Sequence, residues 1–363
     1  MSRPTRILIM AGGTGGHVFP ALAVADALRD RQVEVLWLGT RAGLEARVVP
    51  QAGYPLRVLD VQGLRGTGPA RWLAAPFRLA LALVQALRIL GRERPHAVLG
   101  MGGFVTGPAG VAAWLTRRPL LIHEQNAVAG LTNRLLAPLA VRVMEAFPGA
   151  LGRKRAPVHT GNPVRDAIAE LPDPAQRLAG RHGPLRLLVV GGSLGAAALN
   201  ERVPQAVAAL AAGQRPEIRH QTGPRHIEAA LAAYRDAGVE ARVEPFIEDM
   251  AEAYGWADLV LCRAGALTVA ELAAAGVAAI LVPFPHAVDD HQTRNAEYLV
   301  KGGAAELVQQ SELTPEVLRA RLETYLGPQG RARLLNMAQQ ARALARPEAT
   351  RAVAQACMEV AHG

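Results

Sequence analysis

A histidine closes a glycine-rich stretch near the start of the chain, in Met10-Ala-Gly-Gly-Thr-Gly-Gly-His17. The stretch follows the apolar run Ile7–Met10 and precedes residues 21–28, whose apolar positions have helical spacing. A strand, a glycine turn and a helix in this order direct backbone N–H groups and the helix dipole toward an anion. His17 is the only titratable side chain in the turn. The pattern therefore predicts an anion site beside a proton-transfer group, although a purely structural turn with a satisfied histidine has the same pattern.

A second glycine turn, Gly191-Gly-Ser-Leu-Gly195, lies halfway along the chain, between the apolar run Leu185–Val190 and a helical pattern over residues 196–210. It lacks the Gly-x-Gly-x-x-Gly spacing of dinucleotide sites, and no Gly-Lys-Ser/Thr of a P-loop occurs in the chain. A phosphate or diphosphate held by backbone N–H groups and Ser193 remains as the predicted ligand. The recurrence of such a turn favours ligand binding over mere chain reversal in both places.

The segment from Cys262 to Glu271 also follows an apolar strand and enters a helix. The small residues at positions 264–266 allow a flat ligand to approach the backbone closely. Thr268 and Glu271 have the spacing of a capping box, which is the structural explanation. The functional alternative is that the Glu271 carboxylate accepts hydrogen bonds from both hydroxyls of a ribose.

The segment Pro283–Asn295 is dense in polar groups directly after a buried strand. Four of its side chains are of types that bind metals: His286, Asp289, Asp290 and His291. Their spacing matches no standard ligand pattern, and the chain has no Asp-x-Asp pair. We therefore predict no metal site, and we expect Gln292 to hydrogen-bond a sugar hydroxyl. The polar run His123-Glu-Gln-Asn126 likewise follows a strand, at an edge where α/β proteins bind ligands.

Short apolar runs that alternate with helical patterns must position these motifs. In the first half the clearest strands are Ile7–Met10, Val33–Leu38, Val98–Met101 and Leu120–His123. In the second half they are Leu185–Val190, Ile218–Gln221, Ala241–Val243, Leu259–Cys262 and Ala278–Val282. Runs of this kind are typical of parallel strands covered on both faces. We therefore predict an α/β protein with two tandem Rossmann-like domains facing across a cleft, divided near the proline- and glycine-containing segment 153–163.

The net charge of +9 is concentrated in residues 1–161, which carry +12, whereas residues 162–363 carry −3. A basic half indicates an anionic partner there. Within it, the segment Ala70–Arg92 is apolar on most of its surface and is interspersed with arginines. Such a helix is either buried or lies at a membrane interface, and the charge favours the interface for part of it. Two cysteines fit a reducing cytosol, and neither a secretory signal nor a run of about 18 apolar residues is visible.

Six motifs in order give the sequence a family resemblance. They are Gly12-Gly-Thr-Gly-Gly-His17, His123-Glu-Gln-Asn126, Gly161-Asn-Pro-Val-Arg165, Gly191-Gly-Ser-x-Gly-Ala196, Arg263-x-Gly-Ala-Leu-Thr-Val-x-Glu271 and Asp290-His-Gln292. Over its whole length the chain strongly resembles the MurG family of bacterial glycosyltransferases. The resemblance implies a GT-B type fold without a cofactor. Its domains would be residues 1–161 plus a C-terminal helix, 346–363, facing the acceptor and membrane, and residues 162–345, binding the donor.

The implied reaction is transfer of N-acetylglucosamine from UDP-GlcNAc to the C4 hydroxyl of the N-acetylmuramyl group of lipid I, with inversion, which makes lipid II for peptidoglycan. The implied location is peripheral, on an anionic membrane surface at the cytoplasmic face. Matching motif positions implies contacts with the donor substrate at Thr14, Gly15, Gly16, Asn126, Arg165, Ser193, Ile247, Ala266, Leu267, Thr268, Val269, Ala270, Glu271 and Gln292. The sequence departs from the family pattern at Leu194, where glutamine is common, and at Ala270, where serine is common.

Catalysis without a metal needs a base for the attacking hydroxyl and stabilisation of the leaving diphosphate. Ser193, Arg165 and the glycine-turn N–H groups are predicted to stabilise the diphosphate. His17 is the preferred base, with Glu124 as the second candidate. Two other classes stay open: a UDP-GlcNAc 2-epimerase, which shares fold and donor but needs no apolar basic flank, and a nucleic-acid-binding module. The second does not explain the six motifs, and the chain has few aromatic residues for base stacking, so we predict no nucleic-acid partner.

Overall fold

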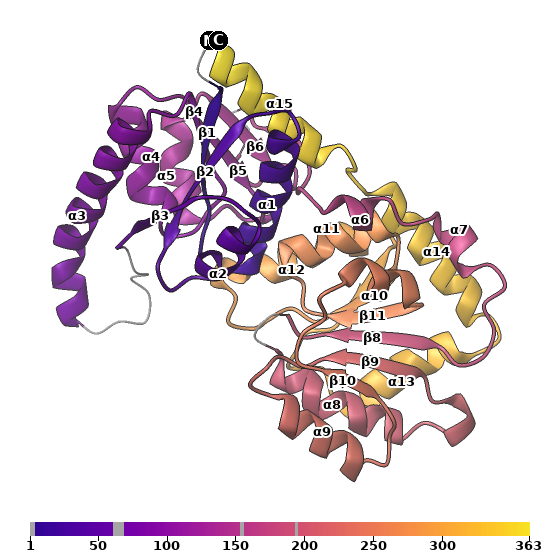
Figure 1. Cartoon of the computed structure of the whole chain (residues 1–363). Coiled ribbons are helices and arrows are strands. Elements are labelled where there is room, and N and C mark those ends of the chain that lie inside the picture. The colour runs from indigo at the N-terminus through magenta and orange to yellow at the C-terminus, as the bar shows by residue number, and fades with distance from the viewer. Residues whose placement is uncertain (1–3, 61–68, 153–155, 193–194) are drawn as a thin grey trace. The chain divides into compact units, whose positions relative to one another are not determined.

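The computed structural model describes residues 4–60, 69–152, 156–192 and 195–363, which divide into two compact units (Figure 1). Unit 1 comprises residues 1–165 and 348–363, and unit 2 comprises residues 166–347. Each unit is built on one sheet whose strands all pair in parallel. The predicted α/β, Rossmann-like fold is therefore confirmed for each unit.

The sheet of unit 1 has the strand order β3-β2-β1-β4-β5-β6-β7. Its strands are β1 (Arg6–Met10), β2 (Glu34–Thr40), β3 (Leu56–Leu59), β4 (Ala97–Gly100), β5 (Leu120–Glu124), β6 (Arg142–Glu145) and β7 (Val158–His159). The order reverses between β1 and β4, and in such sheets ligands bind outside the carboxyl ends of the strands at this point. The first glycine turn follows β1, so the topology places it at the expected edge.

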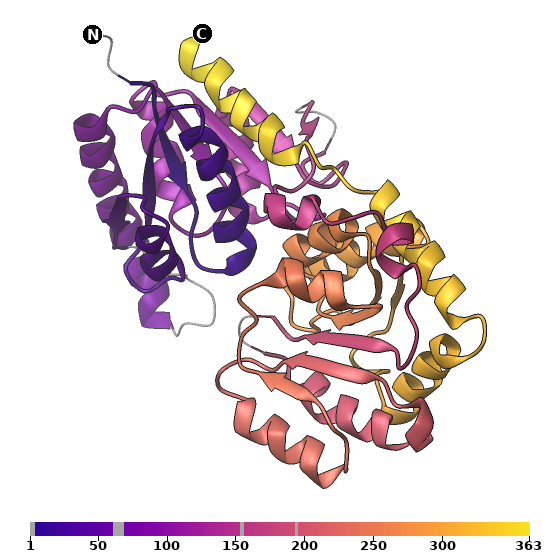
Figure 2. The same cartoon turned by 45° about the vertical axis from the view of Figure 1, so that its right-hand side comes forward.

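Helices cover both faces of this sheet, as its continuously buried central strands require. They are α1 (Gly15–Arg29), α2 (Glu45–Gln51), α3 (Pro69–Glu93), α4 (Thr106–Leu115), α5 (Leu131–Leu136) and α15 (Ala349–His362). Ile7 and Ile9 of β1 pack in one cluster with α1 and with Cys357 of α15, whereas Leu8 packs on the other face with α3 and α4. The C-terminal helix therefore completes the core of unit 1, and it lies along α1 in both views (Figures 1 and 2).

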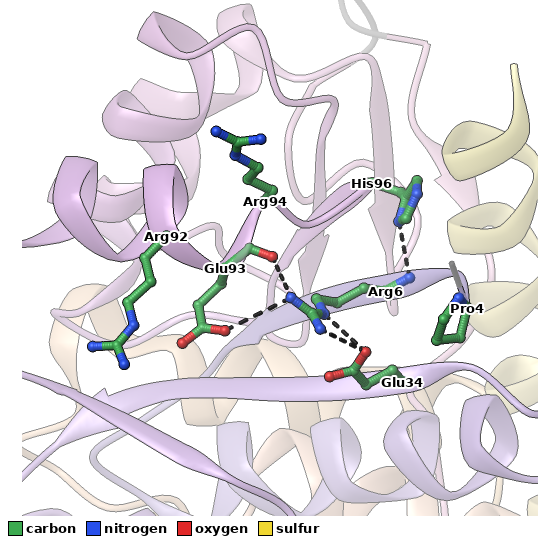
Figure 3. Close-up of a pocket in the computed structure, with 7 residues that line it drawn as sticks. All are labelled: Pro4, Arg6, Glu34, Arg92, Glu93, Arg94 and His96. Carbon is green, nitrogen blue, oxygen red and sulfur yellow. Dashed lines mark hydrogen bonds and ion pairs between the residues drawn. The ribbon is translucent and has the colours of Figure 1, made fainter. Parts of the chain in front are cut away.

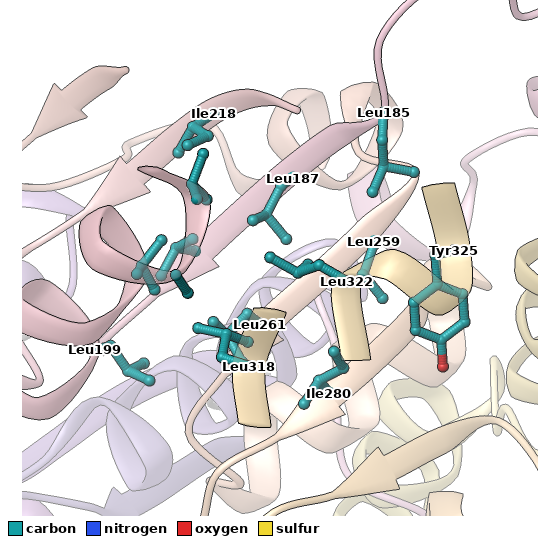
Figure 4. Close-up of a cluster of buried hydrophobic side chains, with 14 of the residues drawn as sticks. Leu185, Leu187, Leu199, Ile218, Leu259, Leu261, Ile280, Leu318, Leu322 and Tyr325 are labelled. Atoms are coloured by element: carbon teal, nitrogen blue, oxygen red, sulfur yellow. The ribbon is translucent and has the colours of Figure 1, made fainter. Parts of the chain in front are cut away.

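Unit 2 repeats the arrangement with the strand order β10-β9-β8-β11-β12-β13. Its strands are β8 (Arg186–Val190), β9 (Glu217–Gln221), β10 (Arg242–Glu244), β11 (Leu259–Cys262), β12 (Ala278–Leu281) and β13 (Ala305–Leu307). Its helices are α6 (Asp166–Ala169), α7 (Pro174–Leu178), α8 (Ala197–Ala208), α9 (Ile227–Asp236), α10 (Met250–Trp256), α11 (Ala266–Ala275), α12 (His291–Lys301), α13 (Pro315–Leu326) and α14 (Gly330–Ala343). Leucine side chains of β8 and β11 pack with Leu318 and Leu322 of α13 in its main core cluster (Figure 4). The second glycine turn again follows the first strand of its unit.

Each predicted strand is present, with ends shifted by at most one or two residues. Strands β3, β6, β7 and β13 were not predicted. They lie toward the edges of their sheets and are short or carry charged residues, so they lack the continuous apolar pattern of central strands.

Candidate active site

The first glycine turn presents backbone donors at the carboxyl end of β1. Helix α1 begins at Gly15, with Thr14 as its N-cap, and the exposed Thr14 side chain makes no capping hydrogen bond. The N–H groups of Gly15 and Gly16 belong to the first turn of α1, where a helix supplies no acceptor for them. Contact of these three positions with the donor stays a prediction.

Glu45, at the start of α2, is a part of this turn that the sequence analysis missed. Its fully buried carboxylate accepts hydrogen bonds from the Gly13 N–H at 2.9 Å and from the Thr40 N–H and hydroxyl at 2.8 and 2.7 Å. A Cβ atom at Gly12 would lie 2.6 Å from Glu45 Oε1, and one at Gly43 would lie 2.1 Å from Oε2. The carboxylate therefore packs against the glycine turn and restricts which residues fit there. It also occupies the Gly13 N–H group, which a ligand anion would otherwise use.

His17 is held by contacts from the ends of two further strands. Its Nδ1 atom lies 3.0 Å from Oε1 of Gln125, which directly follows β5. Gly102, after β4, has φ +94°, and a Cβ atom there would lie 2.7 Å from both Cε1 and Nδ1 of His17. The imidazole is half-buried. It is thus fixed in position while part of the ring stays accessible, as a base for a bound hydroxyl requires.

Glu124, the second candidate base, is buried and fully engaged. Its Oε1 atom accepts from the backbone and side-chain N–H groups of Asn126 at 2.9 and 3.3 Å. Its Oε2 atom accepts from the Gly130 N–H at 3.0 Å and from Asn133 Nδ2 at 2.9 Å. A carboxylate that accepts four hydrogen bonds holds its loop in place. This geometry supports a role for Glu124 in positioning Asn126 rather than in proton transfer.

Arg165 is the last residue of the N-terminal segment of unit 1, residues 1–165. Its guanidinium lies over the ring of Phe19 in α1, with Cζ 5.8 Å from the ring centroid. Phe19 in turn packs beside Gly15, where a Cβ atom would lie 3.0 Å from its Cε2 atom. The predicted anion-binding arginine is therefore held near the first glycine turn by a cation–π contact.

In unit 2, the turn after β8 is held against the neighbouring strand. Ser193 and Leu194 lie outside the described residues. Gly195 has φ +81°, and a Cβ atom there would lie 2.0 Å from the Thr222 carbonyl oxygen, so only glycine fits. Gln221 donates from Nε2 to the Gly192 carbonyl at 3.1 Å and accepts from the Ile247 N–H at 2.8 Å. Because this N–H already has an acceptor, the carbonyl is the Ile247 group we expect to contact a substrate.

Helix α11 carries the predicted donor segment. It begins at Ala266 with Gly265 as N-cap, so Thr268 and Glu271 lie inside the helix and the capping-box interpretation is wrong. Val269 is buried in the unit, whereas Leu267, Thr268 and Ala270 are half-buried. Glu271 as a whole residue is 5% exposed, and its carboxylate accepts a hydrogen bond from the Tyr254 hydroxyl at 3.2 Å. Tyr254 was not predicted from the sequence, and it orients the carboxylate.

Gln292 lies in the first turn of α12, after a loop with an unusual backbone. Asp289 and Asp290 both have positive φ, 52° and 50°, a conformation that costs energy for residues other than glycine. Gln292 Oε1 accepts from the Phe284 N–H at 2.9 Å, which directs the amide nitrogen elsewhere as a donor. Asn295, fully buried, donates from Nδ2 to the Ala264 carbonyl at 3.2 Å. This hydrogen bond ties α12 to the segment that leads into α11.

No three His, Cys, Asp or Glu side chains in the described part of the chain are grouped so as to hold a metal ion. A pocket of about 290 Å³ lies at the opposite edge of the unit 1 sheet, at the starts of β1 and β2 (Figure 3). It is lined by Pro4, Arg6, Glu34, Arg92, Glu93, Arg94 and His96. Arg6 pairs there with Glu34 at 2.8 Å and with Glu93 at 3.8 Å. Because this is the amino edge of the sheet, the pocket is not part of the site at the glycine turn.

Two family models match the chain and together span both units. The glycosyltransferase family 28 N-terminal domain matches residues 7–145, and the family 28 C-terminal domain matches residues 186–355. A relative from Marinobacter nauticus is 59% identical over 99% of this chain and 98% of its own, and one from Alkalilimnicola ehrlichii is 63% identical over 98% and 99%. Both are named UDP-N-acetylglucosamine–N-acetylmuramyl-(pentapeptide) pyrophosphoryl-undecaprenol N-acetylglucosamine transferase. The crystal structure of Acinetobacter baumannii MurG superposes with a TM-score of 0.83 at 46% identity, covering 98% of this chain and 100% of that one.

The chain belongs to the MurG family. The UDP-GlcNAc 2-epimerase of Neisseria meningitidis superposes with a TM-score of 0.66 at 12% identity, covering 98% of this chain and 100% of that one. At that identity the likeness shows a common fold and nothing more. The epimerase alternative is therefore set aside in favour of MurG.

Proposed function

We propose that this MurG-family chain is an inverting transferase that moves N-acetylglucosamine from UDP-GlcNAc to the C4 hydroxyl of the N-acetylmuramyl group of lipid I. The observation that carries this is identity of about 60% over nearly the whole chain to relatives whose names state an N-acetylglucosamine donor and a pyrophosphoryl-undecaprenol acceptor. The glycine turn before α1 and the start of α11 follow β1 and β11 at the carboxyl edges of their sheets, and both support the proposal.

In this proposal unit 2 binds the donor. Glu271 accepts hydrogen bonds from the two ribose hydroxyls, and the Ile247 carbonyl contacts the uracil. The amide nitrogen of Gln292 donates a hydrogen bond to a hydroxyl of the N-acetylglucosamine. The backbone of Ala266–Ala270 lines the nucleotide, with the partly exposed Thr268 and Ala270 nearest to it. Ser193, the turn N–H groups and Arg165 stay the predicted partners of the leaving diphosphate.

Unit 1 supplies the base and the remaining predicted donor contacts. His17 takes the proton of the attacking hydroxyl as the new C1–O bond forms and the bond to UDP breaks, with the electron pair leaving on the diphosphate. Those donor contacts are Thr14, Gly15, Gly16 and Asn126, at the carboxyl edge of the sheet. Glu124 holds Asn126 through the hydrogen bonds described above.

The decisive assay incubates the protein with radiolabelled UDP-GlcNAc, with and without lipid I. We expect label in a lipid product only when lipid I is present, and we expect transfer to persist in EDTA because arginine and backbone donors replace a metal. Formation of UDP-ManNAc without lipid I would instead establish an epimerase. Loss of transfer in EDTA, restored by a divalent cation, would contradict the metal-free mechanism.

We also propose that unit 1 binds the cytoplasmic face of the membrane through the first half of α3. Phe77 is 76% exposed and Leu81 63% exposed, whereas Ala82, Ala86 and Leu90 of the same helix are buried. Trp72 and Leu73, which carried part of the prediction, belong to the residues whose side chains are not described. Further exposed apolar side chains lie on the neighbouring α4 and α5: Trp114, Leu115, Leu131 and Leu135. No helix in the described ranges is long and apolar enough to cross a bilayer.

Vesicle binding tests this proposal. Phe77→Asp or Leu81→Asp should weaken binding to anionic vesicles by about 10-fold or more, the effect of withdrawing one large apolar side chain from an apolar phase. Added salt should weaken it too, because each arginine near anionic headgroups contributes about 1 kcal/mol. Leu231→Asp is the matched control, since Leu231 is an exposed leucine of unit 2, and it should leave vesicle binding intact. Unchanged binding of Phe77→Asp and Leu81→Asp, with turnover on a soluble acceptor analogue retained, would contradict the proposal.

A further inference from the structure

A buried histidine lies behind Gln125, on the side away from His17. His123 Nε2 lies 2.9 Å from the Gly161 carbonyl oxygen, which only accepts, so Nε2 carries a hydrogen. The ring is completely buried, and this burial lowers the pKa of His123 to about 4. A neutral imidazole with its hydrogen on Nε2 has an unprotonated Nδ1, which acts as an acceptor.

This histidine decides the orientation of the Gln125 amide. Gln125 Nε2 lies 3.3 Å from His123 Nδ1 and 3.2 Å from the His123 carbonyl oxygen. Both of these atoms are acceptors, so the amide nitrogen belongs on this side, and the reverse orientation would set two pairs of acceptors against each other. The amide oxygen therefore faces His17, whose Nδ1 is 3.0 Å away.

From this chain of contacts we propose that His123 and Gln125 are positioning residues that hold His17 in the tautomer with its hydrogen on Nδ1. An amide oxygen only accepts, so His17 Nδ1 donates to it, and the lone pair of the neutral ring is on Nε2. Gly102 leaves room for the ring in this position, because a Cβ atom at Gly102 would lie 2.7 Å from His17 Nδ1. The inference rests on the proposed function in one respect: Nε2 is the atom that takes the proton of the acceptor hydroxyl.

The partner of His17 is an amide rather than a carboxylate, and this has a chemical consequence. When Nε2 takes the substrate proton, His17 becomes an imidazolium with hydrogens on both nitrogens, and Gln125 continues to accept from Nδ1. No proton passes to Gln125, because an amide has no basic site near neutral pH. Gln125 therefore selects the tautomer as a neutral hydrogen-bond acceptor.

Nitrogen-15 NMR of histidine-labelled protein measures the tautomer directly. We expect His17, assigned by the signal lost in His17→Gln, to show a protonated Nδ1 and an unprotonated Nε2 at a pH where the ring is neutral. A hydrogen on Nε2 in the wild-type protein would overturn the proposal. This measurement requires no turnover, so absence of transferase activity would overturn the proposed function and leave the tautomer assignment standing.

Two buried glutamines give a matched pair of variants. Gln125→Met keeps the side-chain volume but removes the acceptor for His17 Nδ1. We therefore expect a mixture of His17 tautomers and a kcat lowered by about 10-fold or more, with an unchanged KM for UDP-GlcNAc. Gln221→Met removes an equally buried amide in unit 2, and it should raise the KM for UDP-GlcNAc while leaving the His17 tautomer unchanged. A lower kcat in Gln125→Met with the wild-type tautomer would contradict the proposal. If Gln125→Met lowers the melting temperature too far for assay, the wild-type spectrum alone decides.

Discussion

Replacing His17 with alanine should lower kcat by about 100-fold or more and leave the affinity for UDP-GlcNAc unchanged. A positioned general base contributes about this factor. His17 belongs to unit 1, fixed by Gln125 and Gly102, whereas the residues assigned to the donor lie mostly in unit 2. Steady-state kinetics with both substrates varied, together with calorimetric titration of UDP, separates the two effects.

His96→Ala is the control for this variant. His96 is exposed at the opposite edge of the same sheet, where its Nδ1 accepts from the Arg6 N–H at 3.0 Å. We expect its removal to leave kcat unchanged. An equally large loss of UDP-GlcNAc affinity in His17→Ala would mark His17 as a donor ligand rather than a base.

Glu271→Ala should weaken UDP binding by about 2–3 kcal/mol, the cost of losing hydrogen bonds from two hydroxyls to one carboxylate. This corresponds to a Kd raised by roughly 30- to 150-fold. The carboxylate is almost completely buried and is oriented by Tyr254, so little freedom is lost when a ribose binds. Calorimetry with UDP measures the change directly.

Two comparisons separate a ribose contact from a structural effect. Tyr254→Phe removes only the hydroxyl that donates to Glu271, and it should cost much less affinity than Glu271→Ala. With 2′-deoxy-UDP the penalty of Glu271→Ala should shrink, because one of its two hydroxyl partners is gone. Unchanged UDP affinity in Glu271→Ala, or the same penalty with both nucleotides, would show that Glu271 serves the fold of α11.

The sequence was sufficient for the central strands and for the turns that end them. Ile7–Met10 and Leu259–Cys262 are continuous apolar runs because they are covered on both faces, and that pattern survives in sequence. Edge strands such as β13, with Glu306 at its centre, are short or alternate apolar and polar residues. They therefore lack the continuous apolar pattern that marks a central strand. The capping-box interpretation of Thr268 and Glu271 was wrong because the spacing is the same for a helix that begins earlier, at Ala266.

The contacts inside the candidate site were less predictable than its residue types. His17 and the run His123–Asn126 could be recognised from the sequence as candidate catalytic or binding residues that follow strands. Their connection through Gln125, 108 positions from His17, depends on the parallel pairing of β1, β4 and β5. Glu45 likewise meets Gly13 across 32 positions, and nothing in the local sequence around Glu45 marks it as part of the turn.

The packing of Glu45 has a consequence for mutational tolerance. A Cβ atom at Gly12, Gly39 or Gly43 would come within 2.6 Å of this side chain, so three separate positions depend on one buried side chain. A saturation mutagenesis screen for growth would score all four positions as intolerant, in the same range as residues that contact substrate. Their intolerance would come from steric exclusion around one buried side chain. A second-site Glu45→Ala change would relieve it at Gly43 without restoring the hydrogen bond to the Gly13 N–H.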